Sequence, residues 1–189
     1  AVEGSIVKMA QDYVGTGNHR VLLPEGQFGA RLENGKDAAA TRYIFTKHNP
    51  LDSYVHLAID KPILEYYYHE DGRIKEPVNL LPIYPTILAY GIDGIGTGYS
   101  TKIPCYNPRD LIHLTTQILN EKPKLSKIKP WYHGFKGTIE LSEIKGKYNV
   151  YGKYDFGQDS NGYFIHILEL PIGGNLSINK FMDYLSNCM

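Results

Sequence analysis

Arg42 and Tyr43 are adjacent in the stretch AAATRYIFT (residues 38–46), and their side chains could carry covalent chemistry. A phenol with a pKa near 10 is a poor nucleophile at neutral pH, so it needs a neighbouring cation. Arg42 supplies a permanent, fork-shaped cation that suits phosphate, and Arg31 and Lys36 lie shortly before it. This assembly would suit attack on a phosphodiester to give a phosphotyrosyl link. The alternative is that Tyr43, one of 16 tyrosines, only packs.

A second unusual stretch is the glycine cluster GIDGIGTGYST (residues 91–101). It lacks the lysine of a GxxxxGK[ST] phosphate loop, and its glycines at 94, 96 and 98 follow GxGxG, not the GxGxxG of dinucleotide-binding proteins. Nucleotide binding is therefore disfavoured. Ile95, with glycine on both sides, could be the hydrophobic tip of a tight turn. It could also be a wedge that enters between base pairs and unstacks them, but the spacing alone favours the turn.

Other kinds of catalytic site have little support in the sequence. The chain contains no DxD motif for a two-metal site and no GxSxG nucleophile elbow, so neither a metal site nor a hydrolase triad is predicted. The acidic run from His69 to Gly72 is best interpreted as the solvated tip of a hairpin that turns at Asp71-Gly72.

Composition bounds the class of protein. With 189 residues, 42% hydrophobic and 21% charged, the chain can form one domain or two small ones. The formal net charge is zero, but residues 101–150 hold nine Lys and Arg against four Asp and Glu. Net charge therefore argues neither for nor against nucleic-acid binding, and only a local basic face could indicate it.

The cysteines and the hydrophobic runs indicate the compartment. Cys105 and Cys188 lack CxxC spacing, which indicates a reducing compartment. No apolar run approaches the roughly 18 residues of a membrane span, and no signal peptide opens the chain, so we expect a soluble intracellular protein.

The hydrophobic pattern predicts helices and hairpins. A helix is expected from Val2 up to Gly15, and because this pattern starts without an N-cap, we expect the chain to be part of a longer protein. Asn107 and Pro108 predict the start of another helix and the best boundary between two subdomains. Further elements are expected as follows: a helix over 51–59, a Pro- and Lys-rich connection over 120–134, strands over 136–141, 146–151 and 162–168, and a last helix after Ser177.

Three blocks of the sequence together resemble one known family, the type IIA DNA topoisomerases. They are GQFGARLENGKDAAATRYIFT (Gly26–Thr46), PIYPTILAYGIDGIGTGYSTKIPCYNP (residues 82–108) and FKGTIE (residues 135–140). They occur in the family's order, and the similarity covers nearly the whole chain. The RYIFT sequence resembles the eukaryotic-type, single-chain enzymes and differs from the bacterial A subunits.

The resemblance implies roles for particular residues. Tyr43 matches the tyrosine that attacks DNA and becomes linked to a 5′-phosphate, and Arg42 matches the arginine that assists at the scissile phosphate. DNA contacts are implied for four further residues: Ile95, which matches the isoleucine that wedges into the DNA, and Arg31, Lys36 and Gln27 of the loop before Tyr43.

The resemblance also implies an α+β fold, with a winged-helix domain over residues 1–103 and part of an α/β tower domain over 104–189. The parent enzyme would be a homodimer that cleaves one DNA duplex, passes another through it and reseals the break. It would use Mg²⁺ and ATP bound by domains absent from this chain, so the chain alone is expected to be inactive and to bind no cofactor. The rival from another class is a non-catalytic winged-helix module that binds DNA while Tyr43 only packs.

A few positions depart from the family pattern without removing a group that the chemistry needs: Glu25, Asn34, Thr41 and Tyr99. They indicate a divergent member, and a large DNA virus is a plausible source. A cellular protein of this kind would act in the nucleus, and a viral one in the host cytoplasm or nucleus. No membrane partner is expected.

Overall fold

The computed structural model describes residues 2–122, 126–160, 162–173 and 177–188. Among these residues, every sheet is an antiparallel pair of strands, and short 3-10 helices join several of the elements. The predicted α+β class is confirmed. The helices and strands are α1 (Val2–Ala10), β1 (Leu22–Glu25), β2 (Phe45–His48), β3 (Tyr66–Tyr68), β4 (Ile74–Pro77), α2 (Thr86–Tyr90), β5 (Ile92–Gly96), β6 (Tyr99–Ile103), α3 (Pro108–Leu119), β7 (Thr138–Leu141), β8 (Tyr148–Tyr151), β9 (Lys153–Asp159), β10 (Gly162–Glu169) and α4 (Ile178–Cys188).

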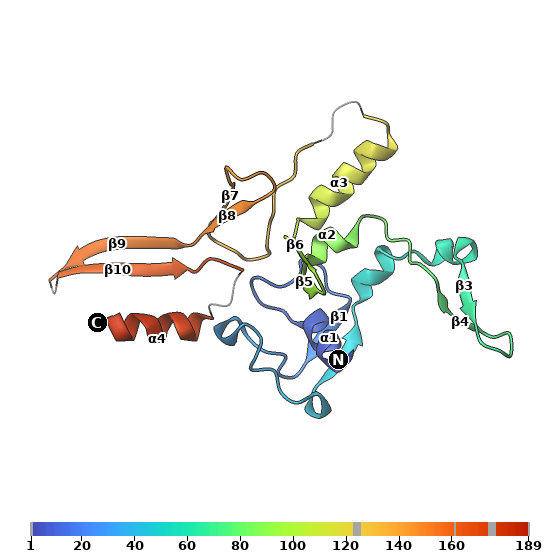
Figure 1. The fold of residues 1–189 in the computed structure, drawn as a ribbon, viewed down its shortest axis with the longest axis horizontal. Helices are drawn as coiled ribbons and strands as arrows, with labels where there is room; N and C mark the ends of the chain where they lie inside the picture. Colours follow the sequence, from blue (N-terminus) through green and yellow to red (C-terminus); the bar gives the residue numbers. More distant parts are fainter. Residues whose placement is uncertain (1, 123–125, 161, 174–176, 189) are drawn as a thin grey trace.

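The hairpins β3–β4 and β9–β10 project at opposite ends of the molecule, and the helices α1, α2 and α3 lie between them (Figure 1). The turn predicted at Asp71-Gly72 is confirmed as the end of β3–β4. None of the helices in the described part of the chain is long and apolar enough to cross a membrane.

Helix α1 is shorter than the sequence predicts. It ends at Ala10 rather than near Gly15. The side-chain amide of Gln11 donates to the backbone carbonyls of Phe28 at 3.0 Å and Gly35 at 3.2 Å, which commits this residue to the following loop. Tertiary hydrogen bonds thus replace the last turn that the hydrophobic pattern predicts.

A small hydrophobic cluster includes Ile44, the residue just before strand β2. Its buried members are Ala10 of α1, Phe28 and Ile44. Strands β1 and β2 pair in register from Leu22 with His48 to Glu25 with Phe45, and the cluster holds the residue that leads into β2. A second cluster, around Val55, Tyr84, Ala89 and Leu111, joins α2 to α3.

The helix predicted over 51–59 is wrong in type. The structure has two 3-10 helices, Pro50–Tyr54 and Ala58–Ile63. The carbonyl of Val55 accepts a hydrogen bond from the N–H of Ile83 at 3.0 Å. Because this carbonyl is taken by another segment, an α-helix cannot continue through it.

The start of α3 is confirmed. The side chain of Asn107 accepts from the N–H of Arg109 at 3.0 Å, and Pro108 occupies the first helical position. Leu111 is fully buried, whereas Ile118, about two turns further along α3, is exposed. The outer end of α3 therefore extends past the small core.

In the second half, β7, β8, β10 and α4 confirm the predicted elements. Strand β9 was missed because its sequence, KYDFGQD, mixes charges and a glycine with its aromatic residues and pairs only with β10. Part of the predicted Pro- and Lys-rich connection, 123–125, lies outside the described residues.

Asn18 ties the two halves of the chain together. Its amide nitrogen donates to the carbonyls of Tyr106 at 2.8 Å and Trp131 at 2.7 Å, and its amide oxygen accepts from the N–H of His133 at 2.9 Å. The residues after the predicted boundary at 103/104 are thus hydrogen-bonded to the first loop. The division into winged-helix and tower domains stays a prediction.

Candidate active site

Tyr43 is the last residue of a 3-10 helix, Thr41–Tyr43, that leads directly into β2. Its N–H donates to the carbonyl of Ala40 at 2.9 Å. The next residue, Ile44, is buried against Gly26, where an added Cβ would lie only 2.9 Å from Ile44 Cγ2. With Ile44 held inside, the Tyr43 side chain projects into solvent and is 66% exposed.

The structure brings Arg42 onto Tyr43. The guanidinium carbon of Arg42 lies 4.6 Å from the centroid of the Tyr43 ring, within the range of a cation–π contact. Within the described part of the chain, no carboxylate forms an ion pair with Arg42. Its N–H fork is therefore available to an incoming anion, and a phosphate is the anion that this geometry suits.

A shallow pocket of about 340 Å³ lies beside this pair and is lined by Arg42, Thr41, Phe28 and Glu3 among others. The Thr41 hydroxyl donates to the Glu3 carboxylate at 2.7 Å, which connects α1 to the 3-10 helix of the tyrosine. This contact occupies the hydroxyl of Thr41, while Arg42 and Tyr43 are exposed beside it.

Several other tyrosines are poor candidates for a nucleophile because they are withdrawn from solvent. Burial raises the pKa of Tyr84 and of Tyr90, with a smaller contribution from the charge of Asp52. Burial likewise raises the pKa of Tyr132 to about 12. These phenols are held in the protonated form, which is the weaker nucleophile.

Gln27 and Lys36 lie on the loop between β1 and the tyrosine. The Gln27 amide donates to Asp37 Oδ2 at 3.1 Å, and Asp37 Oδ1 accepts from the N–H of Ala30 at 2.9 Å. Lys36, next to Asp37, is exposed. The loop thus has a fixed backbone with a cation on its outside. The DNA contacts assigned to Gln27 and Lys36 stay predictions.

Arg31 has a different environment from Lys36. Its side chain is only 20% exposed, and its Nη1 lies 2.5 Å from Glu169 Oε1. Its Nη2 donates to the carbonyl of Leu170 at 2.7 Å. A DNA phosphate would have to compete with both of these acceptors. The predicted DNA contact of Arg31 stays a prediction, but its surroundings argue for another role.

Ile95 lies in strand β5 opposite Ser100 of β6, and not in the turn itself. Its side chain is 91% exposed, so it takes no part in the hydrophobic clusters of the described chain. Gly94 and Gly96 on either side contribute no side chains, so Ile95 has no bulky neighbour directly before or after it in β5. This arrangement suits a wedge. The structure does not place Ile95 in contact with Tyr43 within the described residues.

Sequence reasoning missed a buried carboxylate at the end of β2. Asp52 accepts from three imidazoles, those of His56 at 3.0 Å, His48 at 3.2 Å and His19 at 3.4 Å. A buried carboxylate must be satisfied in this way, and the contacts join the end of β2 to the loop before β1. The Asn49-Pro50 cap could have indicated the 3-10 helix that carries Asp52, but no local signal pointed to His19.

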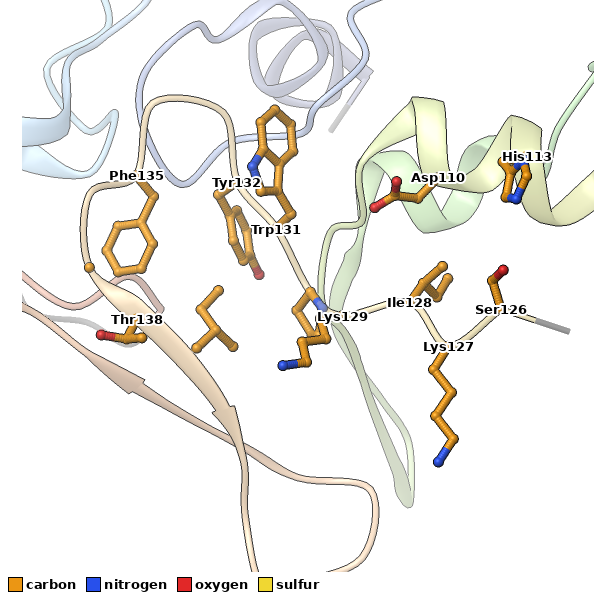
Figure 2. A pocket seen from close by; sticks show the side chains of 13 residues that line it. Asp110, His113, Ser126, Lys127, Ile128, Lys129, Trp131, Tyr132, Phe135 and Thr138 are labelled. Carbon is orange, nitrogen blue, oxygen red and sulfur yellow. The ribbon is translucent and has the colours of Figure 1, made fainter.

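A larger pocket, about 590 Å³, lies elsewhere, between α3 and the segment that leads into β7. Figure 2 shows Asp110 and His113 on α3, Lys127 and Lys129 on the connection, and Trp131 in the segment that follows. Tyr43 does not line it. The pocket offers cations and rings but no paired nucleophile, so its size does not make it the site of the covalent chemistry.

Comparison with known proteins shows the family to which the chain belongs. The family described as the A subunit of DNA gyrase/topoisomerase IV has a sequence model that matches residues 1–189. The chain therefore belongs to this family, the type IIA DNA topoisomerases, as the motifs around Tyr43 predict.

Its relatives are of the eukaryotic type. The chain is 44% identical over 175 residues to DNA topoisomerase 2 of Arabidopsis thaliana, covering 91% of this chain and 12% of that protein. It is 46% identical over 191 residues to DNA topoisomerase 2 of Acanthamoeba polyphaga mimivirus, covering 99% of this chain and 14% of that protein.

A solved structure has the same fold. It is the Plasmodium falciparum topoisomerase II DNA-binding, cleavage and re-ligation domain, with a TM-score of 0.84 and 41% identity. The match covers 97% of this chain and 24% of that one. The chain thus corresponds to a segment of the cleavage core of eukaryotic-type enzymes.

Proposed function

We propose that this chain supplies the tyrosine of the DNA-cleavage site in an ATP-dependent DNA topoisomerase II. The single observation that carries the proposal is the exposed Tyr43 with the Arg42 guanidinium 4.6 Å from its ring, a guanidinium that forms no ion pair with any described carboxylate. The parent enzyme would break one duplex, pass a second duplex through the break and reseal it.

The cleavage step is a transesterification. The Tyr43 hydroxyl loses its proton to solvent and attacks the phosphorus, which forms a phosphotyrosyl bond to the 5′-phosphate. The bond to the 3′-oxygen breaks, and that oxygen takes up a proton. Arg42 stabilises the negative charge on the non-bridging oxygens. Resealing reverses these steps, with the 3′-hydroxyl attacking the phosphotyrosyl bond, so one ester bond is exchanged for another throughout.

DNA would be held and bent by other groups. Lys36 and Gln27 would contact the backbone from the loop before Tyr43, and Ile95 would enter a base step from its hairpin. Phosphate contacts supply most of the affinity, whereas the wedge changes the shape of the duplex.

Mg²⁺ and ATP belong to the proposed parent enzyme and not to this chain. No group of three or more His, Cys, Asp or Glu side chains in the described segments is arranged to hold a metal ion, and the glycine cluster has no phosphate-binding lysine. These residues therefore do not fit either group. We accordingly propose that other domains bind them, that the chain alone is inactive, and that the parent enzyme acts as a homodimer on intracellular DNA.

The test is replacement of Tyr43 by Phe in the full-length protein. The loss of one oxygen should abolish the covalent protein–DNA complex trapped by denaturant, while the Kd for duplex DNA stays within about twofold because phosphate contacts supply most of the affinity. Tyr54→Phe is the matched control, because Tyr54 is 70% exposed in the next 3-10 helix. A covalent complex that persists in Tyr43→Phe would show that the protein uses another nucleophile, or that Tyr43 only packs in a DNA-binding module.

A further inference from the structure

The ion pair between Arg31 and Glu169 joins the tyrosine loop to the end of β10. The Glu169 side chain is only 5% exposed, and its Oε1 lies 2.5 Å from Arg31 Nη1. Its other oxygen accepts from the N–H of Lys136 at 3.1 Å, just before β7. A carboxylate buried this far from water requires such partners, because a buried charge without them is strongly destabilising. Glu169 is thus committed to holding three segments together.

Arginine is the side chain that this junction requires. One arm of the Arg31 fork reaches the carboxylate of Glu169, while the other donates to the carbonyl of Leu170 at 2.7 Å. Two acceptors in fixed directions set the orientation of the guanidinium and of the 3-10 helix that carries it. A second contact, from the Asn179 side chain of α4 to the Glu33 carboxylate, attaches the same helix to the C-terminal part of the chain.

The loop 26–40 connects the Arg31 helix to Tyr43 through a series of contacts, so the position of Arg31 affects the position of Tyr43. Gly35, with φ of +75°, packs against the side chains of Gln11 and Tyr13, so the loop cannot easily move away from α1. Hydrogen bonds span the rest of the distance: Ala30 N–H to Asp37 Oδ1 at 2.9 Å, Ala39 N–H to the Gln27 carbonyl at 3.0 Å, and Tyr43 N–H to the Ala40 carbonyl at 2.9 Å.

We propose that Glu169 is a positioning residue for Tyr43 and acts through Arg31 and the loop 26–40. The proposal rests on the proposed function, since it assigns a role in the same cleavage site. It places part of the control over the tyrosine in the second half of the chain, far from it in sequence. It also assigns Arg31 to the protein's own carboxylate instead of to a DNA phosphate.

The two roles of Arg31 predict opposite behaviour. If Arg31 binds a phosphate, its loss weakens DNA binding and lowers the slope of log K against log salt by about 1. The loss of Glu169 would then leave binding intact or make it tighter, because the cation is released. If the pair positions the loop, both losses impair cleavage at saturating DNA and neither changes the salt slope.

The experiment uses five variants of the full-length protein: Glu169→Gln, Arg31→Gln, the double variant, Arg31→Lys and Asp71→Asn. Asp71→Asn is the matched control, since it breaks the exposed Arg73–Asp71 pair at the distant β3–β4 turn. We expect each variant of the Arg31–Glu169 pair to lower the covalent complex at saturating DNA at least tenfold, with the Kd within twofold and the salt slope unchanged. The double variant should be no worse than the worse single one, because both remove the same contact. Arg31→Lys keeps the charge but not the fork, so its level of covalent complex should lie between those of the wild-type protein and Arg31→Gln.

Hydrogen exchange of the same proteins separates positioning from general stability, and it needs no cleavage. Glu169→Gln should speed exchange at Ala30, Ala39 and Tyr43 while α3 stays protected. Uniform loss of protection, or a normal level of cleavage in Glu169→Gln with a lower salt slope in Arg31→Gln, would overturn the proposal. A wild-type protein that forms no covalent complex would instead refute the proposed function, and the exchange data would still decide whether the Arg31–Glu169 pair holds the loop.

Discussion

Two arginines of the same segment, Arg42 and Arg31, have opposite environments. Arg42 is exposed, has no carboxylate partner within the described chain and lies 4.6 Å from the ring of Tyr43. Arg31 is largely buried, with its fork divided between Glu169 and Leu170. A guanidinium that is already paired with a buried carboxylate has few N–H groups free to bind a substrate phosphate. A guanidinium without such a partner can use its whole N–H fork. The difference teaches that, of the two arginines, Arg42 is the better candidate for contact with a phosphate, because within the described residues it has no carboxylate partner.

The largest effect should come from Arg42. Arg42→Ala removes the cation that stabilises the charge on the phosphate, so cleavage at saturating DNA should fall by about 10²–10³-fold. Arg42→Lys keeps the charge without the fork and should lose less. The measurement is the rate of covalent complex formation, with Arg73→Ala on the β3–β4 turn as control. If Arg42→Ala and Arg73→Ala lower the cleavage rate equally, Arg42 acts no differently from an ordinary exposed arginine.

A variant of Ile95 tests whether an exposed side chain of this chain also changes the shape of the DNA. Ile95→Ala removes an exposed side chain, so folding should be nearly unchanged while DNA bending falls. Cleavage should drop by about tenfold, because without the wedge the cost of unstacking a base step, on the order of a few kcal/mol, is less well offset and the bent DNA is less populated. Energy transfer between dyes at the duplex ends reports the bend. Ile74→Ala, at an exposed position of β4, is the control. Intact bending with a melting temperature many degrees lower would mean that Ile95 packs against protein.

The smallest effect is expected at Lys36, the exposed cation in the same loop as Arg31. Lys36→Gln should lower the slope of log K against log salt by about 1 and weaken DNA binding several-fold at low salt. Fluorescence anisotropy at a series of salt concentrations measures both, with Lys75→Gln on β4 as control. An unchanged slope would show that Lys36 does not contact DNA phosphate. Arg42, which follows this loop, would then be the remaining exposed cation proposed to contact phosphate.

Local signals predicted local structure well. Asn107 and Pro108 start α3 as expected, and Asp71-Gly72 turns the β3–β4 hairpin, because caps and turns depend on a few adjacent residues. The Arg42–Tyr43 contact was equally accessible, since the two residues are neighbours.

Long-range pairs could not be predicted in this way. Glu169 contacts Arg31 from the other half of the chain, and the sequence around either residue contains no pattern that predicts this pairing. Asp52 likewise gathers His19 from a separate loop. Both are buried carboxylates whose partners are set by tertiary packing, which hydrophobic periodicity does not encode. The sequence therefore indicated the exposed part of the candidate site and missed the contacts that hold it in place.

The most direct test is to identify the amino acid that carries the DNA. The full-length protein would be incubated with duplex DNA, trapped with denaturant, digested with nuclease and protease, and analysed by mass spectrometry. The account predicts that, of the 16 tyrosines in this chain, only Tyr43 carries a nucleotide, joined through its 5′-phosphate. A nucleotide on any other residue, or a 3′-phosphate link, would contradict it.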